Sequence, residues 1–462
     1  MRIGTLPLNA ATRVVSAPAM KLFNKVRQRK GILESLSNIG WLGSDRIVRM
    51  FGAVLIGTLV ARYLGPNQFG LLNYGLAIFG LFNIISSLGL DSLIVRDVAL
   101  DSNGEPRILG TAFVLKALAS VVTTVAAIVA ARILDPHNRV LIIIVALISS
   151  ASISQALDVI DFFFQAHTRS RHTVVPRTGA FVAGSLARLV AVFMHASLLA
   201  FAWIAALEVL VAEFGLVVTY FRYRGIFPRW NWDLKQAKGL MAESWPLLVS
   251  SVMVMVYMRT DQILLGKFSS MSTVGNYTAA IRFSEIWYAI PVIVTTSVMP
   301  RILKTRDVNP QRYYARLQTF YETMIMVSVL VTIGTLILGP TMVHLLYGAR
   351  YSSAASILSI HIWTGVFVSV GCVGGQQYVH EKITSSQLSR TVLGAIANVI
   401  LNLLWIPRWG GIGSAMATLV SYSISAYFAD ALQSQTRHIF RMKSEAFLKF
   451  WMVPIRLLRT EQ

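Results

Sequence analysis

Apolar residues recur along this chain in blocks of about twenty, the length that an α-helix needs to cross the hydrocarbon core of a bilayer. Hydrophobic residues make up 55% of the 462 positions and charged residues only 14%, and the mean hydropathy is +0.60. Soluble globular proteins do not have this composition. We therefore expect an all-α integral membrane protein. The blocks predict about twelve transmembrane helices, at residues 39–61, 69–90, 108–131, 140–165, 174–195, 198–220, 244–266, 276–300, 316–338, 353–378, 385–406 and 412–435.

The basic residues are distributed unevenly about these spans. The chain has 42 Lys and Arg and a net charge of +21, which at first sight indicates nucleic acid as a partner. Most of the Lys and Arg outside the spans, however, lie in connections on the same side of the membrane as the N-terminus. Such a bias marks the cytoplasmic side. Both termini are therefore expected in the cytoplasm, and nucleic acid is not an expected partner.

This arrangement divides the chain into five segments. They are a basic cytoplasmic N-terminal segment (1–38), an N-terminal six-helix lobe (39–221), a basic cytoplasmic linker (222–243), a C-terminal six-helix lobe (244–435) and a basic amphipathic cytoplasmic tail (436–462). No apolar block precedes the first span, so no cleavable signal peptide is expected. The N-terminal segment is either a short amphipathic helix on the membrane surface or a solvated tail that only sets the topology. The tail is expected to contain an interfacial helix.

The first predicted span, within Trp41–Ala61, carries Asp45, Arg46 and Arg49. An arginine near the middle of a membrane helix costs a few kcal/mol, so it is rare unless it faces a wet cavity or a partner. At ~1.5 Å per residue, Arg49 lies about 15 Å into the span, close to the midplane. The three charges can share one helical face because they are three and four residues apart. Either this face lines a cavity, or Asp45 only neutralises Arg49.

A sequence pattern follows directly after this charged helix. The run ARYLGPNQFGLLNYG at residues 61–75 resembles the corresponding part of the polysaccharide-biosynthesis exporters, the flippases of lipid-linked oligosaccharides such as O-antigen units. That family shares a superfamily with the multidrug-and-toxin extruders (MATE) and the peptidoglycan lipid flippase. The segments DQILLG at 261–266 and VGNYTAAIR at 274–282 resemble its seventh and eighth helices. GLLNYG at 70–75 also aligns weakly with GNYTAA at 275–280, as expected for two parallel six-helix repeats.

The resemblance implies a MATE-like fold and a function. It implies a secondary transporter, not an enzyme, that moves an undecaprenyl-diphosphate-linked oligosaccharide across the bacterial plasma (inner) membrane by alternating access. The pathway would be cell-surface polysaccharide biosynthesis, such as lipopolysaccharide O-antigen or exopolysaccharide. Expected partners are this lipid-linked substrate, membrane lipids and a coupling ion, proton or sodium, with polysaccharide polymerase machinery as a further candidate.

Charged residues inside the predicted spans are the candidate site residues. Arginine in a low-dielectric cavity suits a diphosphate through paired charge-assisted hydrogen bonds, whereas a buried carboxylate can couple transport to an ion. The candidates for substrate binding are Arg46, Arg49, Lys116, Arg188, Arg259 and Arg282. The candidates for ion coupling are Asp45, Glu208, Glu213 and Asp261. Structural ion pairs between helices are the alternative for each of them. Arg282 and Glu285 are expected to pair, and Asp158 and Asp161 are interpreted as boundary charges.

Two other classes of function remain open. A cation-coupled drug antiporter of the same superfamily would favour acidic residues in the cavity. A membrane polysaccharide polymerase or ligase would be expected to present a sizeable outer loop, whereas every predicted outer loop is short. The sequence has no phosphate-binding loop and no His-Glu-x-x-His motif, and its single cysteine, Cys372, excludes an intrachain disulfide. No cofactor or metal site is expected.

Overall fold

The computed structural model describes residues 17–101, 103–225, 230–306 and 308–453; the side chains of residues 17–40, 42–44, 46–47 and 384–385 lie outside this description. The described residues form helices and short connections, with no β-strand among them. The predicted amphipathic character of the N-terminal segment therefore falls outside the described side chains. The α-helices are α1 Ala17–Ser86, α2 Asp91–Leu100, α3 Glu105–Leu134, α4 Arg139–Ala151, α5 Val159–Ala166, α6 Arg171–Phe193, α7 Leu198–Arg224, α8 Leu234–Phe268, α9 Met271–Leu303, α10 Pro310–Tyr347, α11 Ser352–His361, α12 Thr364–Glu381, α13 Thr384–Ser423, α14 Ala429–Leu432 and α15 Arg437–Lys449.

The all-α membrane architecture is confirmed within the described residues. Eight helical stretches are long and apolar enough to cross a bilayer, or nine if the bent pair formed by α11 and α12 counts as one span. Two long helices are broken by a glycine with positive φ, Gly65 in α1 (φ 69°) and Gly410 in α13 (φ 52°). Each break falls between two predicted spans. The number of twelve crossings itself stays a prediction.

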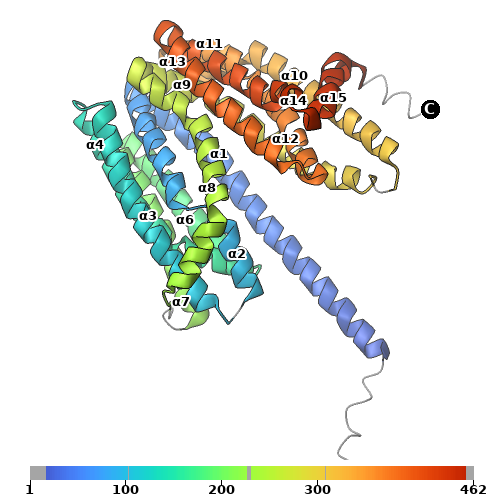
Figure 1. Ribbon diagram of the computed structural model, residues 1–462. Helices are drawn as coiled ribbons and strands as arrows, with labels where there is room; N and C mark the ends of the chain where they lie inside the picture. Colours follow the sequence, from blue (N-terminus) through green and yellow to red (C-terminus); the bar gives the residue numbers. More distant parts are fainter. Residues whose placement is uncertain (1–16, 102, 226–229, 307, 454–462) are drawn as a thin grey trace, which may run out of the picture.

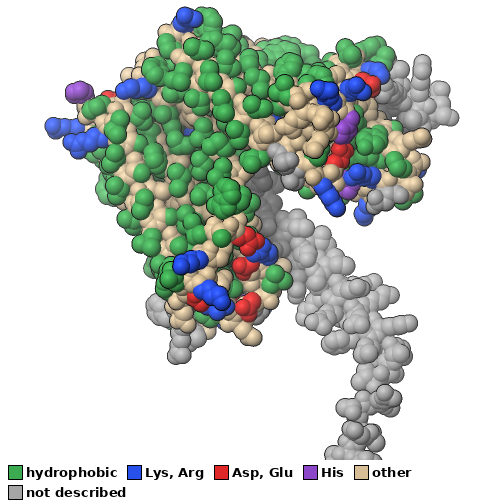
Figure 2. All heavy atoms as spheres, in the orientation of Figure 1, with side chains coloured by type: hydrophobic (Ala, Val, Ile, Leu, Met, Phe, Trp, Pro, Cys, Tyr) green, Lys and Arg blue, Asp and Glu red, His purple; other side chains and the backbone are tan. Residues whose placement is uncertain are grey.

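Two helical bundles make up the molecule (Figure 1). Helices α1 to α7 form the first, here called the N bundle, and α8 to α15 form the second, the C bundle. Helix α1 joins them, because it packs on α3, α4 and α6 as well as on α8 and α9. Figure 2 shows hydrophobic side chains over the middle of the visible face of the N bundle, with charged side chains gathered at its ends. A bilayer requires such an apolar band.

The bundles touch closely where α1 bends at Gly65. A Cβ on Gly275 of α9 would lie 2.0 Å from the carbonyl oxygen of Pro66, and a Cβ on Gly70 would lie 1.8 Å from that of Met271. Only glycine permits this approach of two helix backbones. The phenol of Tyr351 also donates a hydrogen bond of 2.7 Å to the carbonyl of Ala61. This region, here called the closed end, contains several of the predicted outer loops.

The described part of the predicted linker is bound to the N bundle. The backbone N–H of Asn231 donates to the carbonyl of Pro106 at 3.1 Å, and the N–H of Asp233 donates to the hydroxyl of Thr111 at 3.1 Å. Trp230 packs on Phe113 with ring centroids 5.3 Å apart. The first turns of α8 are therefore attached to the N bundle, and its later turns belong to the C bundle.

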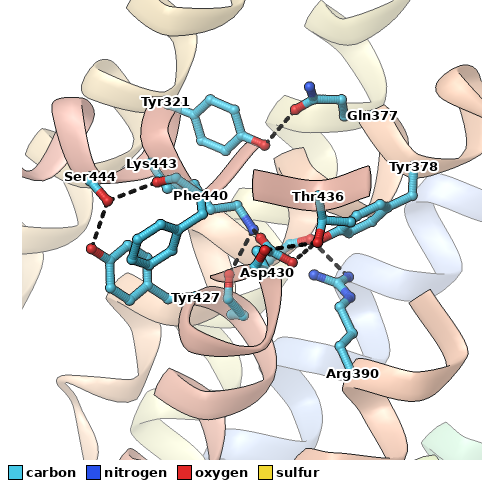
Figure 3. A network of polar contacts seen from close by, with 12 residues as sticks. Tyr321, Gln377, Tyr378, Arg390, Tyr427, Asp430, Thr436, Phe440, Lys443 and Ser444 are labelled. Atoms are coloured by element: carbon cyan, nitrogen blue, oxygen red, sulfur yellow. Dashed lines mark hydrogen bonds and ion pairs between the residues drawn. The ribbon is translucent and has the colours of Figure 1, made fainter. Parts of the chain in front are cut away.

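The tail forms helix α15, which is anchored in the C bundle and does not merely rest on its surface (Figure 3). The side chain of Lys443 is fully buried, and its Nζ donates to Asp430 Oδ2 at 2.6 Å and to the carbonyl of Ala426 at 2.7 Å. Ala426 lies in a π-helical turn, Ile424–Phe428. Such a turn changes the helical hydrogen-bond pattern, and here a carbonyl accepts from a side chain.

Candidate functional site

Two adjoining cavities lie in the N bundle among α1, α6 and α7. The larger has a volume of about 410 Å³ and the smaller of about 220 Å³. Glu208 lines both, so the two cavities adjoin at this side chain. The charged residues lining the larger cavity are Asp45, Arg49, Asp158, Arg177, Glu208 and Glu213. Those lining the smaller cavity are Arg188, Glu208 and Arg282.

Arg49 is both paired and accessible in the larger cavity. Its Nε donates to Asp45 Oδ1 at 2.8 Å, and the hydroxyl of Thr178 donates to the same carboxylate oxygen. The guanidinium carbon lies 5.5 Å from the ring centroid of Phe181. The Arg49 side chain nevertheless keeps 35% of its surface exposed. The ion pair considered from the sequence is therefore present, and it leaves part of the cation open to the cavity.

A second group of charges surrounds Arg177, which also lines this cavity. Arg177 bridges Asp158 and Asp161, with a distance of 3.0 Å from Nη1 to Asp161 Oδ2. Lys116, whose side chain is 5% exposed, lies 3.7 Å from Asp158 Oδ2 and joins the same group. Glu213 is buried, and its Oε2 has no hydrogen-bond partner among the described residues. A buried acceptor without a partner is costly, so this oxygen is available to a proton or to a donor that enters the cavity.

Sequence reasoning missed Arg177 and took Asp158 and Asp161 for ordinary boundary charges. The structure places both aspartates around the Arg177 guanidinium at the cavity wall. A signal was present, because two aspartates three residues apart on one helix face precede a span whose first turn carries an arginine. The aspartates were interpreted from their depth along the span alone, and a position near the end of a helix does not indicate whether the side chain faces the interior of the bundle.

The smaller cavity contains an ion pair and a cation from the other bundle. Arg188 Nη2 lies 2.7 Å from Glu208 Oε2. Gly184 gives this carboxylate its space, because a Cβ there would lie 2.5 Å from Oε2. Arg282 comes from α9 of the C bundle, and its guanidinium lies 5.0 Å from the ring centroid of Phe69. Its Nη1 is buried without a hydrogen-bond partner in the described part of the chain.

Other sequence-predicted residues lie elsewhere. The predicted Arg282–Glu285 pair is wrong, because no ion pair joins them within the described residues and Arg282 instead packs on Phe69. Arg259 faces α1 at Gly80, where a Cβ would lie 3.8 Å from its Nε. The side chain of Arg46 lies outside the described residues.

Asp261 belongs to a separate network in the interior of the C bundle. Its carboxylate accepts hydrogen bonds from the hydroxyls of Tyr277 and Thr418 and from Asn402 Nδ2, the last at 2.8 Å. The hydroxyl of Ser414 in turn donates to Asn402 Oδ1 at 2.8 Å. Asn398, one turn before Asn402, also lies beside this carboxylate. This network is rich in oxygen atoms, and no cation of the described chain pairs with Asp261.

Known proteins are similar to this chain in sequence and in fold. The chain is 31% identical over 183 residues to a probable flippase, AglR, of Haloferax volcanii, which covers 38% of this chain and 37% of that relative. It is 20% identical over 374 residues to a putative O-antigen transporter of Escherichia coli K12, covering 78% of this chain and 88% of the relative. The fold is similar to that of the lipid II flippase MurJ in an inward closed conformation, with a TM-score of 0.69 at 12% identity, covering 92% of this chain and 93% of MurJ.

The match with AglR spans less than two fifths of that relative's length. The fold and the apolar helices identify a multi-pass membrane protein. Residues 35–306 match the polysaccharide biosynthesis protein family. This match covers more than half of the sequence, including both cavities and the helix that joins the bundles. The chain therefore belongs to the polysaccharide biosynthesis protein family.

Proposed function

We propose that the protein is a flippase that carries an undecaprenyl-diphosphate-linked oligosaccharide across the bacterial plasma membrane, for cell-surface polysaccharide biosynthesis. The observation that carries this proposal is the set of arginines that line the two adjoining cavities. Arg49 lines the larger cavity, and Arg188 and Arg282 line the smaller one. The names of the matched relatives, a probable flippase and a putative O-antigen transporter, support the same reading.

The chemistry of the cavity suits a diphosphate. Guanidinium groups bind phosphate oxygens through two parallel hydrogen bonds, and these bonds are stronger where water is excluded. Arg282 offers a buried nitrogen without a protein partner among the described residues, and Arg49 is partly exposed. The lipid tail would stay in the bilayer while the diphosphate and its sugars pass between the bundles.

Rocking of the two bundles would expose the cavities alternately to the two sides. The contacts at the closed end, including Pro66 with Gly275 and Tyr351 with Ala61, would break when the opposite side closes. With the N-terminus in the cytoplasm, the closed end faces outward. The conformation in which the closed end is packed would then receive substrate from the inner leaflet.

Ion coupling is proposed at Asp261 rather than at the N-bundle carboxylates. Asp45 and Glu208 already pair with arginines at 2.8 and 2.7 Å, whereas Asp261 is surrounded by hydroxyl and amide groups. Sodium prefers oxygen ligands, as other hard cations do, and protonation is the other way to neutralise a buried carboxylate. Glu213 is the second candidate because its Oε2 lacks a partner in the described structure.

The function is tested with purified protein in proteoliposomes that contain a labelled polyprenyl-diphosphate-linked oligosaccharide. Transport is measured as loss of access of a membrane-impermeant glycosidase to the label. Wild type should transport, whereas the variant Arg49→Gln/Arg188→Gln/Arg282→Gln should not. The matched control is Arg132→Gln, an exposed cation outside both cavities. Export of cationic dyes without transport of the lipid-linked sugar would instead favour the drug antiporter.

A further inference from the structure

The C bundle has a groove between the ends of α9 and α10 that is separate from the cavities described above. Its volume is about 510 Å³. Three exposed arginines line it, Arg301 from α9 and Arg312 and Arg316 from α10. The buried side chains of Ile302 and Phe320 form an apolar floor. We call this feature the arginine groove.

The three arginines of the groove have no acidic partner within ion-pair distance among the described residues. Arginines of α2, α3 and α7 do have one. These pairs are Arg96 with Glu243, Arg107 with Asp233, and Arg224 with Glu105. Three guanidinium groups around one groove repel each other, and an anion between them would relieve that repulsion. The groove is therefore complementary to an anion that the protein itself does not supply.

The predicted span boundaries would place the groove at the height of a lipid headgroup. Arg301 directly follows the predicted span 276–300, and Arg316 begins the predicted span 316–338. Beyond the arginines the wall continues along α10 at Thr319 and Thr323. Their hydroxyls donate to the carbonyls of Ala315 and Thr319 in the same helix, at 3.1 and 2.8 Å. This stretch of wall therefore needs no polar ligand, and an acyl chain can lie against it.

We propose that the arginine groove binds an anionic phospholipid of the surrounding leaflet. The headgroup phosphate would lie among the three guanidinium groups, and the first part of one acyl chain would pack on Phe320. Clusters of basic residues at the cytoplasmic edge of a membrane protein bind anionic lipids in this way. The transported lipid is a different occupant, because its proposed path runs through the two cavities among α1, α6 and α7, and none of the residues that line the groove lines those cavities.

The test uses the full-length protein in nanodiscs of phosphatidylcholine that contain increasing fractions of phosphatidylglycerol. Native mass spectrometry counts the phosphatidylglycerol molecules retained, and thermal unfolding measures stabilisation. The variant Arg301→Gln/Arg312→Gln/Arg316→Gln should lose one tightly retained lipid, with apparent affinity at least about tenfold weaker. The matched control Arg222→Gln/Lys235→Gln/Lys238→Gln removes the same charge from exposed positions in the last turn of α7 and the first turns of α8 and should retain the lipid.

Three outcomes would overturn the proposal. Equal retention in the groove variant and wild type would remove the arginines from lipid binding. Equal loss of the lipid in both triple variants would show that its retention depends on net charge and not on the groove. Stoichiometric displacement of phosphatidylglycerol by a polyprenyl diphosphate, but not by inorganic phosphate, would assign the groove to the transported lipid. If the triple variant does not fold, the single variant Arg316→Glu gives the same comparison, because one reversed charge should already weaken retention.

Discussion

The guanidinium group of Arg282 occupies the space that a side chain at Gly57 would need. A Cβ on Gly57 would lie 2.0 Å from Arg282 Nη1. Gly57 belongs to α1 of the N bundle and Arg282 to α9 of the C bundle, so the contact crosses the boundary between the two. Arg282, a candidate for substrate binding, can therefore take this position only because Gly57 on the opposite bundle has no side chain.

The variant Gly57→Ala should therefore displace Arg282 and reduce transport. Loss of a charge-assisted hydrogen bond is worth roughly 1.5–3 kcal/mol, so we expect at least about a tenfold reduction. The control is Gly179→Ala on α6, where a Cβ would meet nothing within 4 Å. The measurement is transport in proteoliposomes at matched protein amounts. Unchanged transport in Gly57→Ala would show that the position of Arg282 does not matter.

Arg49 and Asp45 give a second prediction. If Arg49 binds the diphosphate, Arg49→Ala should abolish transport with unchanged membrane abundance. Arg49→Lys should restore only part of the transport, because lysine lacks the planar guanidinium group that forms two parallel hydrogen bonds. If the 2.8 Å pair with Asp45 is only structural, Arg49→Ala should lower abundance by leaving a carboxylate unpaired. Asp45→Asn/Arg49→Ala would then recover abundance and transport together, and that recovery would retire Arg49 as a ligand.

The sequence was sufficient to predict the all-helical membrane architecture, because blocks of apolar residues report span length directly. It was also sufficient to single out Arg49, Arg188, Glu208 and Arg282, all of which line the two cavities. Spacing along one helix could not reveal the partner of each charge. Arg282 was expected to pair with Glu285 three residues later, but it reaches across to Phe69 of the other bundle.

Residues with partners far apart in sequence were the least predictable. Asp261 was a candidate for ion coupling from the sequence. The three residues that donate hydrogen bonds to it come from distant parts of the chain: Tyr277 from α9, and Asn402 and Thr418 from the two parts of α13 on either side of Gly410. Lys443 lies in a tail rich in basic residues, and nothing in that composition distinguishes it from its solvated neighbours. Its burial depends on the π-helical turn at Ile424–Phe428 and on Asp430, which periodicity alone does not indicate.

The Asp261 network predicts where transport is coupled to an ion. Asp261→Asn keeps the shape of the side chain and removes its charge, so it should leave the protein folded and abolish the dependence of transport on a sodium or proton gradient. Thr418→Ala removes one hydroxyl that donates to the carboxylate and should weaken that dependence. The control is Glu213→Gln in the N bundle. Lost dependence only in Glu213→Gln would move coupling to the N bundle.

His438 predicts a pH dependence of stability at the tail. Its Nε2 lies 2.9 Å from Glu381 Oε2, and this hydrogen bond raises the pKa of His438 above its ordinary value. A raised histidine pKa contributes stability that is complete below the ordinary value, about 6.5, and that is lost as the pH rises through the folded-state value. The unfolding temperature of wild type should therefore fall with rising pH in this window more steeply than the unfolding temperature of His438→Gln. The exposed His137→Gln should match wild type; a matching slope in His438→Gln would contradict the prediction.

Lys443 and Asp430 should stabilise the attachment of α15 as a pair. Lys443→Met leaves the buried Asp430 carboxylate without its cation, which costs about 3–5 kcal/mol in comparable cases, whereas Lys443→Met/Asp430→Asn should recover much of this loss. The control is Lys449→Met, which removes an exposed lysine paired with Glu445 at 3.6 Å; such pairs contribute about 0.5 kcal/mol or less.

The pH dependence of the same variants separates the pair from simple packing. Burial lowers the pKa of Lys443 to about 8, whereas an unfolded lysine keeps its proton to about pH 10. Between these values the unfolded state binds more protons, so the free energy of unfolding of wild type should rise with pH. Lys443→Met lacks the titrating group, so its stability in thermal unfolding should change less with pH between pH 8 and 10. Parallel slopes would mean that Lys443 titrates normally, and that its contacts with Asp430 and Ala426 are not kept in the membrane-embedded protein.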